Sequence, residues 1–277
     1  MNKDTVIISM TTWPPRLSSV EPAYRSILRQ ITPHMNVHPV LVLARDEFQK
    51  DNLPEPIKNL AASGVELIWS DNLRSHKKLM PTLEKYPDNA VLVVDDDIEM
   101  SGGWLQTFLS DHEAYPNDII YGQSMEVLYV NRSGRIKVYG HTQPFPNSGK
   151  PTLLDKPASG AAGTLFPSRT FTDARFFDMQ LAMTLSPTCD ESWQYCFAII
   201  ENRSFRKLSR YNIGFYLPSN QDAGLWRINN TEIGAVRQSL LAKEFPEYLL
   251  RLKERCLLSD FTEDYYKPIK EDLWKEK

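Results

Sequence analysis

The chain has few cysteines and no large excess of charge of either sign. Its 277 residues include Cys189, Cys196 and Cys256, an odd number without a Cys-x-x-Cys pair. This pattern argues against a disulfide framework and against a zinc site, and it favours a reducing compartment. A net charge of -3 gives no polybasic character, so nucleic acid is not the expected partner.

Long apolar runs are absent as well, because no segment carries the roughly 20 consecutive apolar residues that a membrane-spanning helix needs. The first residues pass directly into the strand-like segment 6–8, which is too short for the apolar part of a signal peptide. We therefore expect a cytoplasmic protein. With 42% hydrophobic and 24% charged residues, the chain can bury a sizeable core as one large domain or as one domain with an appendage.

Strand-like and helix-like segments alternate through the first half of the chain. Strands are expected at residues 6–10, 39–43, 65–69 and 91–94, and helices near 20–30 and 76–85. Such alternation is typical of βαβ units. It predicts an α/β fold with a mostly parallel central sheet flanked by helices.

The pattern changes in the second half of the chain. Residues 127–130 and 136–139 flank a polar turn and predict a small antiparallel hairpin. Small residues at 159–163 precede a short strand, and small side chains allow a ligand to approach the backbone. Amphipathic helices are expected at 235–257 and 266–277, where they form a C-terminal helical extension.

Three aspartates, Asp95, Asp96 and Asp97, directly follow the apolar run 91–94. A run without alternation predicts a strand buried on both faces, and ligands of such sheets bind at the carboxyl ends of the strands. An Asp-x-Asp there suits Mg²⁺ or Mn²⁺, with coordination positions left for the oxygens of a diphosphate. The structural alternative is a solvated acidic turn in which Asp97 caps the next helix.

A second acidic pair, Asp190 and Glu191, comes just before a helical pattern. Trp193, Phe197 and Ile200 recur at helical spacing, which places both acids in the first turn of that helix. A favourable interaction with the helix dipole would explain the pair without any catalytic role. The functional interpretation is a general base presented at the mouth of the helix.

Five motifs, in order along the chain, resemble those of the bacterial GT-A glycosyltransferases that build capsule, lipopolysaccharide or lipooligosaccharide. They are Ile-Ser-Met-Thr-Thr-Trp-Pro-Pro-Arg at 8–16, Leu-Arg-Ser-His-Lys-Lys at 73–78, Asp-Asp-Asp-Ile at 95–98, Ser-Gly-Ala-Ala-Gly at 159–163 and Pro-Thr-Cys-Asp-Glu-Ser-Trp at 187–193. Ala162 stands where the family's turn has a glycine, and Glu191 where its acidic pair ends in aspartate. The resemblance extends over roughly residues 6–200.

The resemblance implies a GT-A domain over residues 1–230, followed by the helical extension 231–277. Within the domain, residues 1–125 or so would bind a nucleotide sugar and residues 126–230 the acceptor. Specific roles are implied for the matching motifs. Asp95 and Asp97 would hold Mn²⁺ or Mg²⁺, which acts as a Lewis acid on the diphosphate.

The resemblance also implies a set of donor-binding residues, which are Thr11, Pro15, Arg16, Arg74, His76, Lys77, Lys78, Asp95, Asp96, Gly160 and Gly163. Lys77 and Lys78 point to different sides of a helix, so one of them is expected to face the site. Asp190 or Glu191 would be the general base. An inverting transfer is favoured, although nothing in the spacing separates it from a retaining one.

The resulting interpretation is a metal-dependent glycosyltransferase that moves a hexose from a nucleotide sugar, most often a UDP-sugar, to a glycan acceptor. The acceptor is expected to be lipid-linked and to belong to a bacterial surface polysaccharide. The enzyme would then work at the inner face of the inner membrane, with peripheral contact through C-terminal residues 249–253.

Two other functions fit the same residues. A sugar-phosphate nucleotidyltransferase also combines an α/β nucleotide fold with acid-bound Mg²⁺. It normally has a glycine-rich phosphate loop after the first strand, and residues 11–16 do not form one. A non-catalytic glycan-binding subunit is the third possibility. The acids at 95–97 and at 190–191 are both present, which argues against a protein that has lost its catalytic activity.

Overall fold

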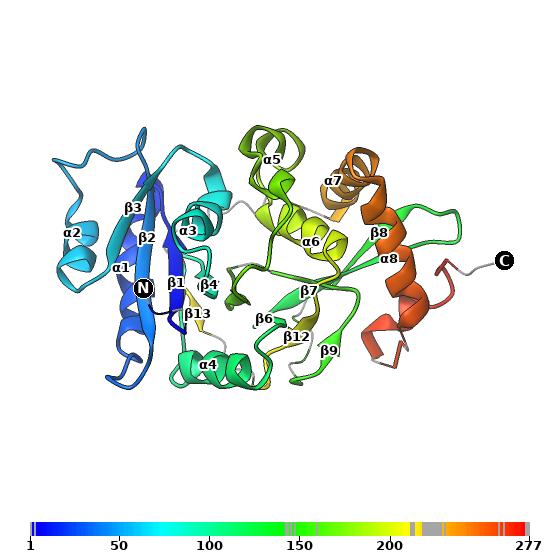
Figure 1. Ribbon diagram of the computed structural model, residues 1–277, viewed down its shortest axis with the longest axis horizontal. Helices are drawn as coiled ribbons and strands as arrows, with labels where there is room; N and C mark the ends of the chain where they lie inside the picture. Colours follow the sequence, from blue (N-terminus) through cyan, green and yellow to red (C-terminus); the bar gives the residue numbers. More distant parts are fainter. Residues whose placement is uncertain are drawn as a thin grey trace.

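The computed structural model describes residues 2, 4–141, 144, 146, 148–158, 160–210, 214–217, 229, 231–259, 261, 262 and 264–274. Its centre is an eight-stranded sheet (Figure 1). The strands in spatial order are β3 (Glu66–Ser70), β2 (Val37–Ala44), β1 (Val6–Thr11), β4 (Val91–Val94), β11 (Thr164–Phe166), β6 (Ile119–Tyr121), β12 (Phe205–Lys207) and β9 (Pro151–Thr152).

The sheet is mostly parallel, as the alternating pattern predicts. β1 pairs in parallel with β2 and β4, β2 pairs with β3, and β12 pairs with β6. β11 runs antiparallel to both of its neighbours, and β9 is antiparallel to β12. Because the chain places β2 and β3 on one side of β1 and β4 on the other, a topological switch point lies between β1 and β4. This is where open α/β sheets bind ligands.

Helices cover both faces of the sheet. They are α1 (Leu17–Leu28), α2 (Glu55–Ala62), α3 (Met80–Lys85), α4 (Trp104–Ala114), α5 (Met179–Leu185), α6 (Asp190–Ile200), α7 (Thr231–Glu244) and α8 (Pro246–Leu258), with short 3-10 helices η1 (Pro14–Arg16), η2 (Arg74–Lys78), η3 (Ala174–Phe177) and η6 (Asp264–Ile269).

The two faces of β4 belong to two different hydrophobic clusters. Leu92 and Val94 pack in the cluster that includes residues of α1, α2 and α4. Val91 and Val93 belong to the cluster that includes residues of α3, α6, α7 and α8. All four side chains are fully buried, so the apolar run without alternation is a central strand, as predicted.

Two smaller antiparallel sheets complete the fold. One has the order β10 (Asp155–Pro157), β7 (Ser124–Val130), β8 (Ile136–Gly140), in which β7 and β8 form the predicted hairpin. The other pairs β13 (Phe215–Tyr216) with β5 (Ile98–Glu99), which follows the three aspartates directly. The α/β class, the parallel centre and the small antiparallel part are therefore confirmed.

The C-terminal segment differs in detail from the prediction. The helix expected at 235–257 is two helices, α7 and α8, because Pro246 lacks the amide hydrogen that a continuous helix requires and begins the second helix instead. Of the segment expected to be helical at 266–277, residues 266–269 belong to the short 3-10 helix η6, and residues 275–277 lie outside the described residues. Leu241 and Leu252 are fully buried in the cluster shared with α6. In Figure 1, α1 and α2 lie at one end of the molecule, and α7 and α8 at the other.

A buried carboxylate holds η6 against the rest of the fold. Asp155 accepts hydrogen bonds from the hydroxyls of Tyr121, Tyr265 and Tyr266 at 2.8–3.1 Å, and Lys207 Nζ lies 3.4 Å away. These contacts fix the two η6 tyrosines against β10. No helix in the described part of the chain combines the length and the apolar character needed to cross a membrane.

Candidate active site

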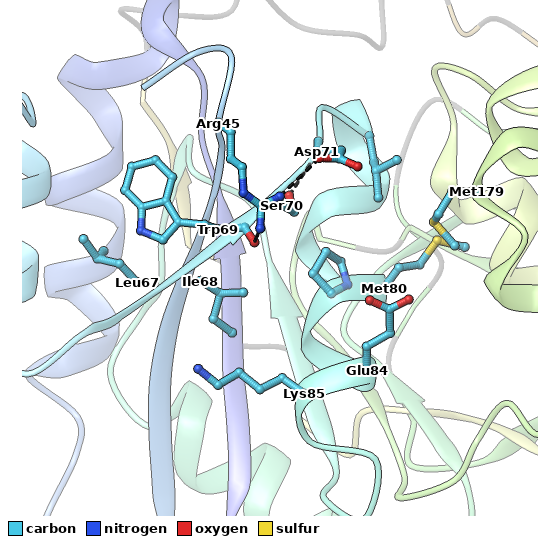
Figure 2. A pocket seen from close by; sticks show the side chains of 12 residues that line it. Arg45, Leu67, Ile68, Trp69, Ser70, Asp71, Met80, Glu84, Lys85 and Met179 are labelled. Carbon is cyan, nitrogen blue, oxygen red and sulfur yellow. Dashed lines mark hydrogen bonds and ion pairs between the residues drawn. The ribbon is translucent and has the colours of Figure 1, made fainter. Parts of the chain in front are cut away.

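A cavity of about 640 Å³ opens between the edge strand β3 and helix α3 (Figure 2). Arg45 and Asp71 lie at one end of it, with Arg45 Nη1 3.2 Å from Asp71 Oδ1, and Glu84 and Lys85 lie at the other. Its lining does not include the acids at 95–97 or 190–191. We place the candidate site at the acids, because the three aspartates follow β4 at the switch point between β1 and β4, where open α/β sheets bind ligands, whereas the cavity lies beside the edge strand β3.

Asp96 is held at the switch point between β1 and β4. Thr12 Oγ1 donates to Asp96 Oδ2 at 2.6 Å, and Arg16 Nη1 lies 2.7 Å from Asp96 Oδ1 and 3.1 Å from Asp97 Oδ2. Burial raises the pKa of Asp96, and the charge of Arg16 opposes that rise. The segment after β1 thus fixes the acidic turn after β4. Thr12 was not predicted, whereas the predicted Thr11 donates to the Val42 carbonyl within the sheet.

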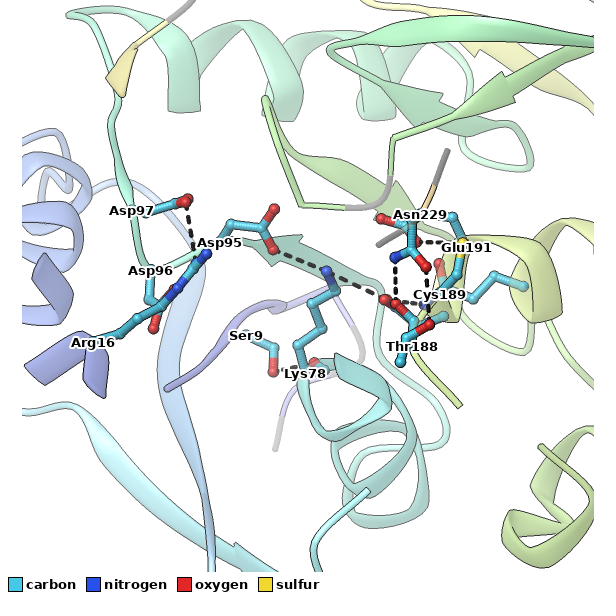
Figure 3. A network of polar contacts seen from close by, with 12 residues as sticks. Ser9, Arg16, Lys78, Asp95, Asp96, Asp97, Thr188, Cys189, Glu191 and Asn229 are labelled. Atoms are coloured by element: carbon cyan, nitrogen blue, oxygen red, sulfur yellow. Dashed lines mark hydrogen bonds and ion pairs between the residues drawn. The ribbon is translucent and has the colours of Figure 1, made fainter. Parts of the chain in front are cut away.

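Lys78 joins the two acidic groups of the sequence (Figure 3). Its Nζ lies 2.9 Å from Asp95 Oδ1 and 3.3 Å from Asp190 Oδ2, and its side chain is only 4% exposed. Ser9 Oγ donates to the Lys78 carbonyl at 2.6 Å, which ties η2 to β1. Burial lowers the pKa of Lys78, but the charges of Asp190 and Asp95 outweigh that effect and hold the pKa well above its ordinary value. The ammonium is therefore a permanent charge.

Replacing Lys78 by methionine is expected to lower the free energy of unfolding by about 3 kcal/mol. The reason is that Asp190, which is buried, and Asp95 would lose the ammonium between them. Chemical denaturation of the purified protein measures the loss. The control is Lys58→Met, at an exposed position, with an expected change below about 0.5 kcal/mol. A Lys78→Met protein as stable as the wild type would show that the carboxylates do not depend on this charge.

The other residues of the 73–78 motif point elsewhere. Lys77 Nζ pairs with Glu47 at 2.6 Å, so one lysine of the two faces the acids, as expected. His76 Nε2 lies 2.8 Å from the Ser186 carbonyl, and burial lowers the pKa of His76 to about 4. His76 is thus neutral near pH 7. Arg74 is exposed at a φ of 50°.

The small-residue turn approaches the acids through one of its two predicted glycines. The Asp95 amide donates to the Gly160 carbonyl at 3.1 Å, and a Cβ on Gly160 would overlap the Asp95 carboxylate. Gly163, with a φ of 89°, instead packs against Trp104, where a Cβ would lie 2.6 Å from the indole ring. Gly163 is therefore placed for packing, and Gly160 for access to the acids. Pro15 is exposed in η1.

The acidic pair occupies the first turn of α6, as predicted. Asp190 Oδ2 accepts from Gln194 Nε2 at 3.0 Å in addition to its contact with Lys78. Glu191 Oε2 accepts from the Cys189 thiol at 3.1 Å. Burial and the charge of Asp190 raise the pKa of Glu191, and burial raises the pKa of Cys189 to about 11. Cys189 is thus a protonated hydrogen-bond donor at neutral pH.

Five further polar residues surround the pair and were not predicted. Lys156 and Glu126 are cross-strand partners on β10 and β7, with 2.7 Å between charged atoms, and the charge of Lys156 reaches Glu191. Thr188, Asn229 and Arg237 form a hydrogen-bonded group behind the pair. The register of the pairing between β10 and β7 would have been needed to find Lys156 and Glu126, and only the tertiary fold brings Asn229 and Arg237 to Thr188.

The acids at 95–97 offer the donor atoms that a divalent cation prefers. Asp95 and Asp97 present carboxylate oxygens that are paired with Lys78 and Arg16, respectively. Asp96 is held by both Thr12 and Arg16. Among the described residues, no group of three or more His, Cys, Asp or Glu side chains is arranged around a possible metal position. Two carboxylates alone would leave most positions of a divalent cation's shell to oxygens of a ligand or of water.

The chain belongs to glycosyl transferase family 2, because the model of that family matches residues 14–171, more than half of the sequence. That region contains β4, η2 and the three aspartates. Membership makes the protein a glycosyltransferase with the GT-A fold. No curated protein sequence matches the chain.

Solved structures of S. aureus TarS share this fold. TarS 1–349 in complex with UDP has a TM-score of 0.52 at 12% identity, over 92% of this chain and 66% of that one. TarS 1–349 in complex with UDP-GlcNAc has a TM-score of 0.50 at 11% identity, over 93% and 82%. A longer TarS structure has a TM-score of 0.51 at 13% identity, and this chain covers 47% of it. At these identities the likeness concerns the fold alone.

Proposed function

We propose that this protein transfers a sugar from a nucleotide sugar, a UDP-sugar in the first instance, to a hydroxyl of a glycan acceptor. The observation that carries the proposal is the position of Lys78, which contacts Asp95 on the donor side and Asp190 on the acceptor side. One ammonium thus joins the two acidic groups that a transferase needs, one for the leaving diphosphate and one for the attacking hydroxyl. The bound UDP and UDP-GlcNAc of the TarS structures support this choice of donor.

On the donor side, Asp95 and Asp97 would hold Mn²⁺ or Mg²⁺. When bound, the ion supplies positive charge to the leaving diphosphate. Arg16 and Lys78 add two fixed protein charges at the same place, both already oriented by carboxylates. Such preoriented charges stabilise a developing anion more strongly than water does. Thr11 and Pro15 remain proposed contacts of the nucleotide, and Arg74 of the diphosphate.

On the acceptor side, we assign the general base to Glu191. Asp190 is committed to Lys78 and Gln194, which fix its carboxylate in place. Glu191 has a raised pKa and accepts a weak hydrogen bond from the Cys189 thiol. Proton removal by one base opposite the leaving group gives a single displacement, so we propose inversion at the anomeric carbon.

The reaction products separate this function from its rivals. The protein is incubated with Mn²⁺ and a panel of UDP-, GDP-, CMP- and dTDP-sugars. We expect one donor to be hydrolysed slowly, with release of the nucleotide and the free sugar. Release of pyrophosphate from a nucleoside triphosphate and a sugar 1-phosphate would instead identify a nucleotidyltransferase. Binding of a sugar without turnover of any donor would identify a glycan-binding subunit.

We further propose that the acceptor is lipid-linked and belongs to a bacterial surface polysaccharide. Two exposed leucines on α8 support a membrane contact. Leu250 is 59% exposed and Leu257 is 47% exposed, and they lie seven residues apart on one helix face. Within the expected contact segment 249–253, Leu252 instead faces the core.

Vesicle sedimentation tests this membrane contact. The double variant Leu250→Ser, Leu257→Ser is expected to lower sedimentation with anionic phospholipid vesicles several-fold, because it removes the two apolar side chains that would insert into the bilayer surface. Glu254→Ser, on the same exposed face, is the matched control and should sediment like the wild type. Equal sedimentation of all three proteins would contradict peripheral contact through α8.

A further inference from the structure

Helix α7 carries a buried arginine that reaches the turn in front of the acidic pair. Arg237 is 6% exposed, and its Nη2 donates to Thr188 Oγ1 at 3.0 Å and to Asn229 Oδ1 at 3.2 Å. Thr188 lies two residues before Asp190. The helix is outside residues 14–171, the part of the chain that the family model matches. A residue beyond the family region therefore contacts the segment that presents the proposed base.

Asn229 also binds Thr188. Its Nδ2 donates to the Thr188 carbonyl at 2.6 Å, and its Oδ1 accepts from Thr188 Oγ1 at 2.9 Å. Both polar groups of Thr188, the hydroxyl and the carbonyl, are thus fixed from the C-terminal part of the chain. Figure 3 shows Asn229 beside Thr188, close to Cys189 and Glu191.

The other end of the turn is fixed from the donor side. Ser186 Oγ donates to the Cys189 carbonyl at 2.5 Å, and the Ser186 carbonyl accepts from His76 of η2 at 2.8 Å. His76 and Lys78 of one short 3-10 helix therefore contact the turn and Asp190, respectively. The turn 186–189 is held between η2 and α7, so its position depends on both.

We infer that Arg237 is a positioning residue of the acceptor half, which holds the turn 186–189 so that Glu191 meets the acceptor hydroxyl. This inference rests on the proposed function, and it makes α7 part of the proposed acceptor site. Anchoring of α7 itself does not require the arginine, because Leu241 of the same helix is fully buried in the core. A guanidinium also suits the task, since its rigid donors contact two oxygens at once.

The test compares transfer with donor hydrolysis in Arg237→Gln and in Asn229→Ala. We expect kcat for transfer to fall roughly 10- to 100-fold in each, because small misplacements of a catalytic group have effects of that size. Donor KM and donor hydrolysis without acceptor should stay within about twofold, because the donor side is untouched. Arg251→Gln, an exposed arginine on α8, is the control and should behave as the wild type.

A second measurement does not depend on turnover. Cys189 lies within the same turn and is one of three buried thiols, with Cys196 and Cys256 as internal references. Arg237→Gln should raise the rate of labelling of Cys189 by a thiol reagent about tenfold, because the turn opens more often, and leave the other two rates unchanged. Unchanged labelling of Cys189 would overturn the inference, as would unchanged transfer. A wild-type protein without donor turnover would overturn the proposed function instead, while the labelling result still decides the role of Arg237.

Discussion

Replacing Asp97 by alanine is expected to lower nucleotide-sugar turnover by about 10³-fold and to remove its dependence on Mn²⁺. Asp97 and Asp95 are the two carboxylates that we assign to the ion, because Asp96 is held by both Thr12 and Arg16. With one ligand removed, the site keeps too few oxygens to hold a hard cation. Steady-state donor hydrolysis and calorimetric titration with Mn²⁺ in the presence of UDP measure the two effects.

A second change at the same place acts without removing a carboxylate. Gly160→Ala should displace the Asp95 side chain, because the added Cβ would overlap it, and so weaken Mn²⁺-dependent binding of UDP at least tenfold. Gly102→Ala is the matched control, since nothing lies within 4 Å of its Cβ. Full activity of Asp97→Ala without metal would contradict the assignment of these acids to an ion.

Replacing Glu191 by glutamine is expected to lower kcat for transfer by roughly 10²- to 10⁴-fold, the usual contribution of a general base. The affinity for the donor should not change, because the donor contacts lie on η1, η2 and the turn after β4. Transfer by the wild type should fall as the pH drops, because the protonated acid accepts no proton. That fall should occur above the ordinary glutamate range, since burial and Asp190 raise the pKa of Glu191.

Asp190→Asn distinguishes the two acids. It leaves Lys78 with Asp95 alone and removes a buried carboxylate, so we expect it to lower both stability and donor binding along with transfer. Glu191→Gln should lower transfer alone. If Glu191→Gln kept full transfer while Asp190→Asn lost transfer without losing stability, the base would be Asp190.

The central strand and both acidic groups were predictable because their signals are local. Four consecutive apolar residues form β4, and the three aspartates are the next residues in the chain, so they must lie at the carboxyl end of the strand. The first-turn position of Asp190 and Glu191 followed from the helical spacing behind them in the same way. Binary pattern and the carboxyl-end rule for parallel sheets are enough for such placements.

The contact between the acidic groups was not predictable, because it depends on tertiary geometry. Lys78 lies 17 residues before Asp95 and 112 before Asp190 in the sequence. Its direction is set by the 3-10 form of η2, in which neighbouring residues point about 120° apart, so Lys77 turns to Glu47. The same argument applies to Arg237, whose partner Thr188 lies 49 residues away in the chain.

The predicted bounds of the C-terminal helices were wrong, and residues visible in the sequence explain the difference. Pro246 interrupts the amphipathic pattern, and it begins α8 because its missing amide hydrogen matters least at a helix start. The helix expected at 266–277 includes Tyr266, whose hydroxyl instead donates to the buried Asp155 on β10. This hydrogen bond joins η6 to a residue that lies 111 positions earlier in the chain and that the helical spacing does not indicate.

The most direct test of the account is a crystal structure of this protein with UDP and Mn²⁺. The account predicts the diphosphate and the ion at Asp95 and Asp97, with Arg16 and Lys78 close to the phosphate oxygens. The cavity between β3 and α3 offers a different position, lined by residues such as Trp69 and Lys85. A diphosphate bound in that cavity, with the acids at 95–97 still paired to Lys78 and Arg16, would contradict the account.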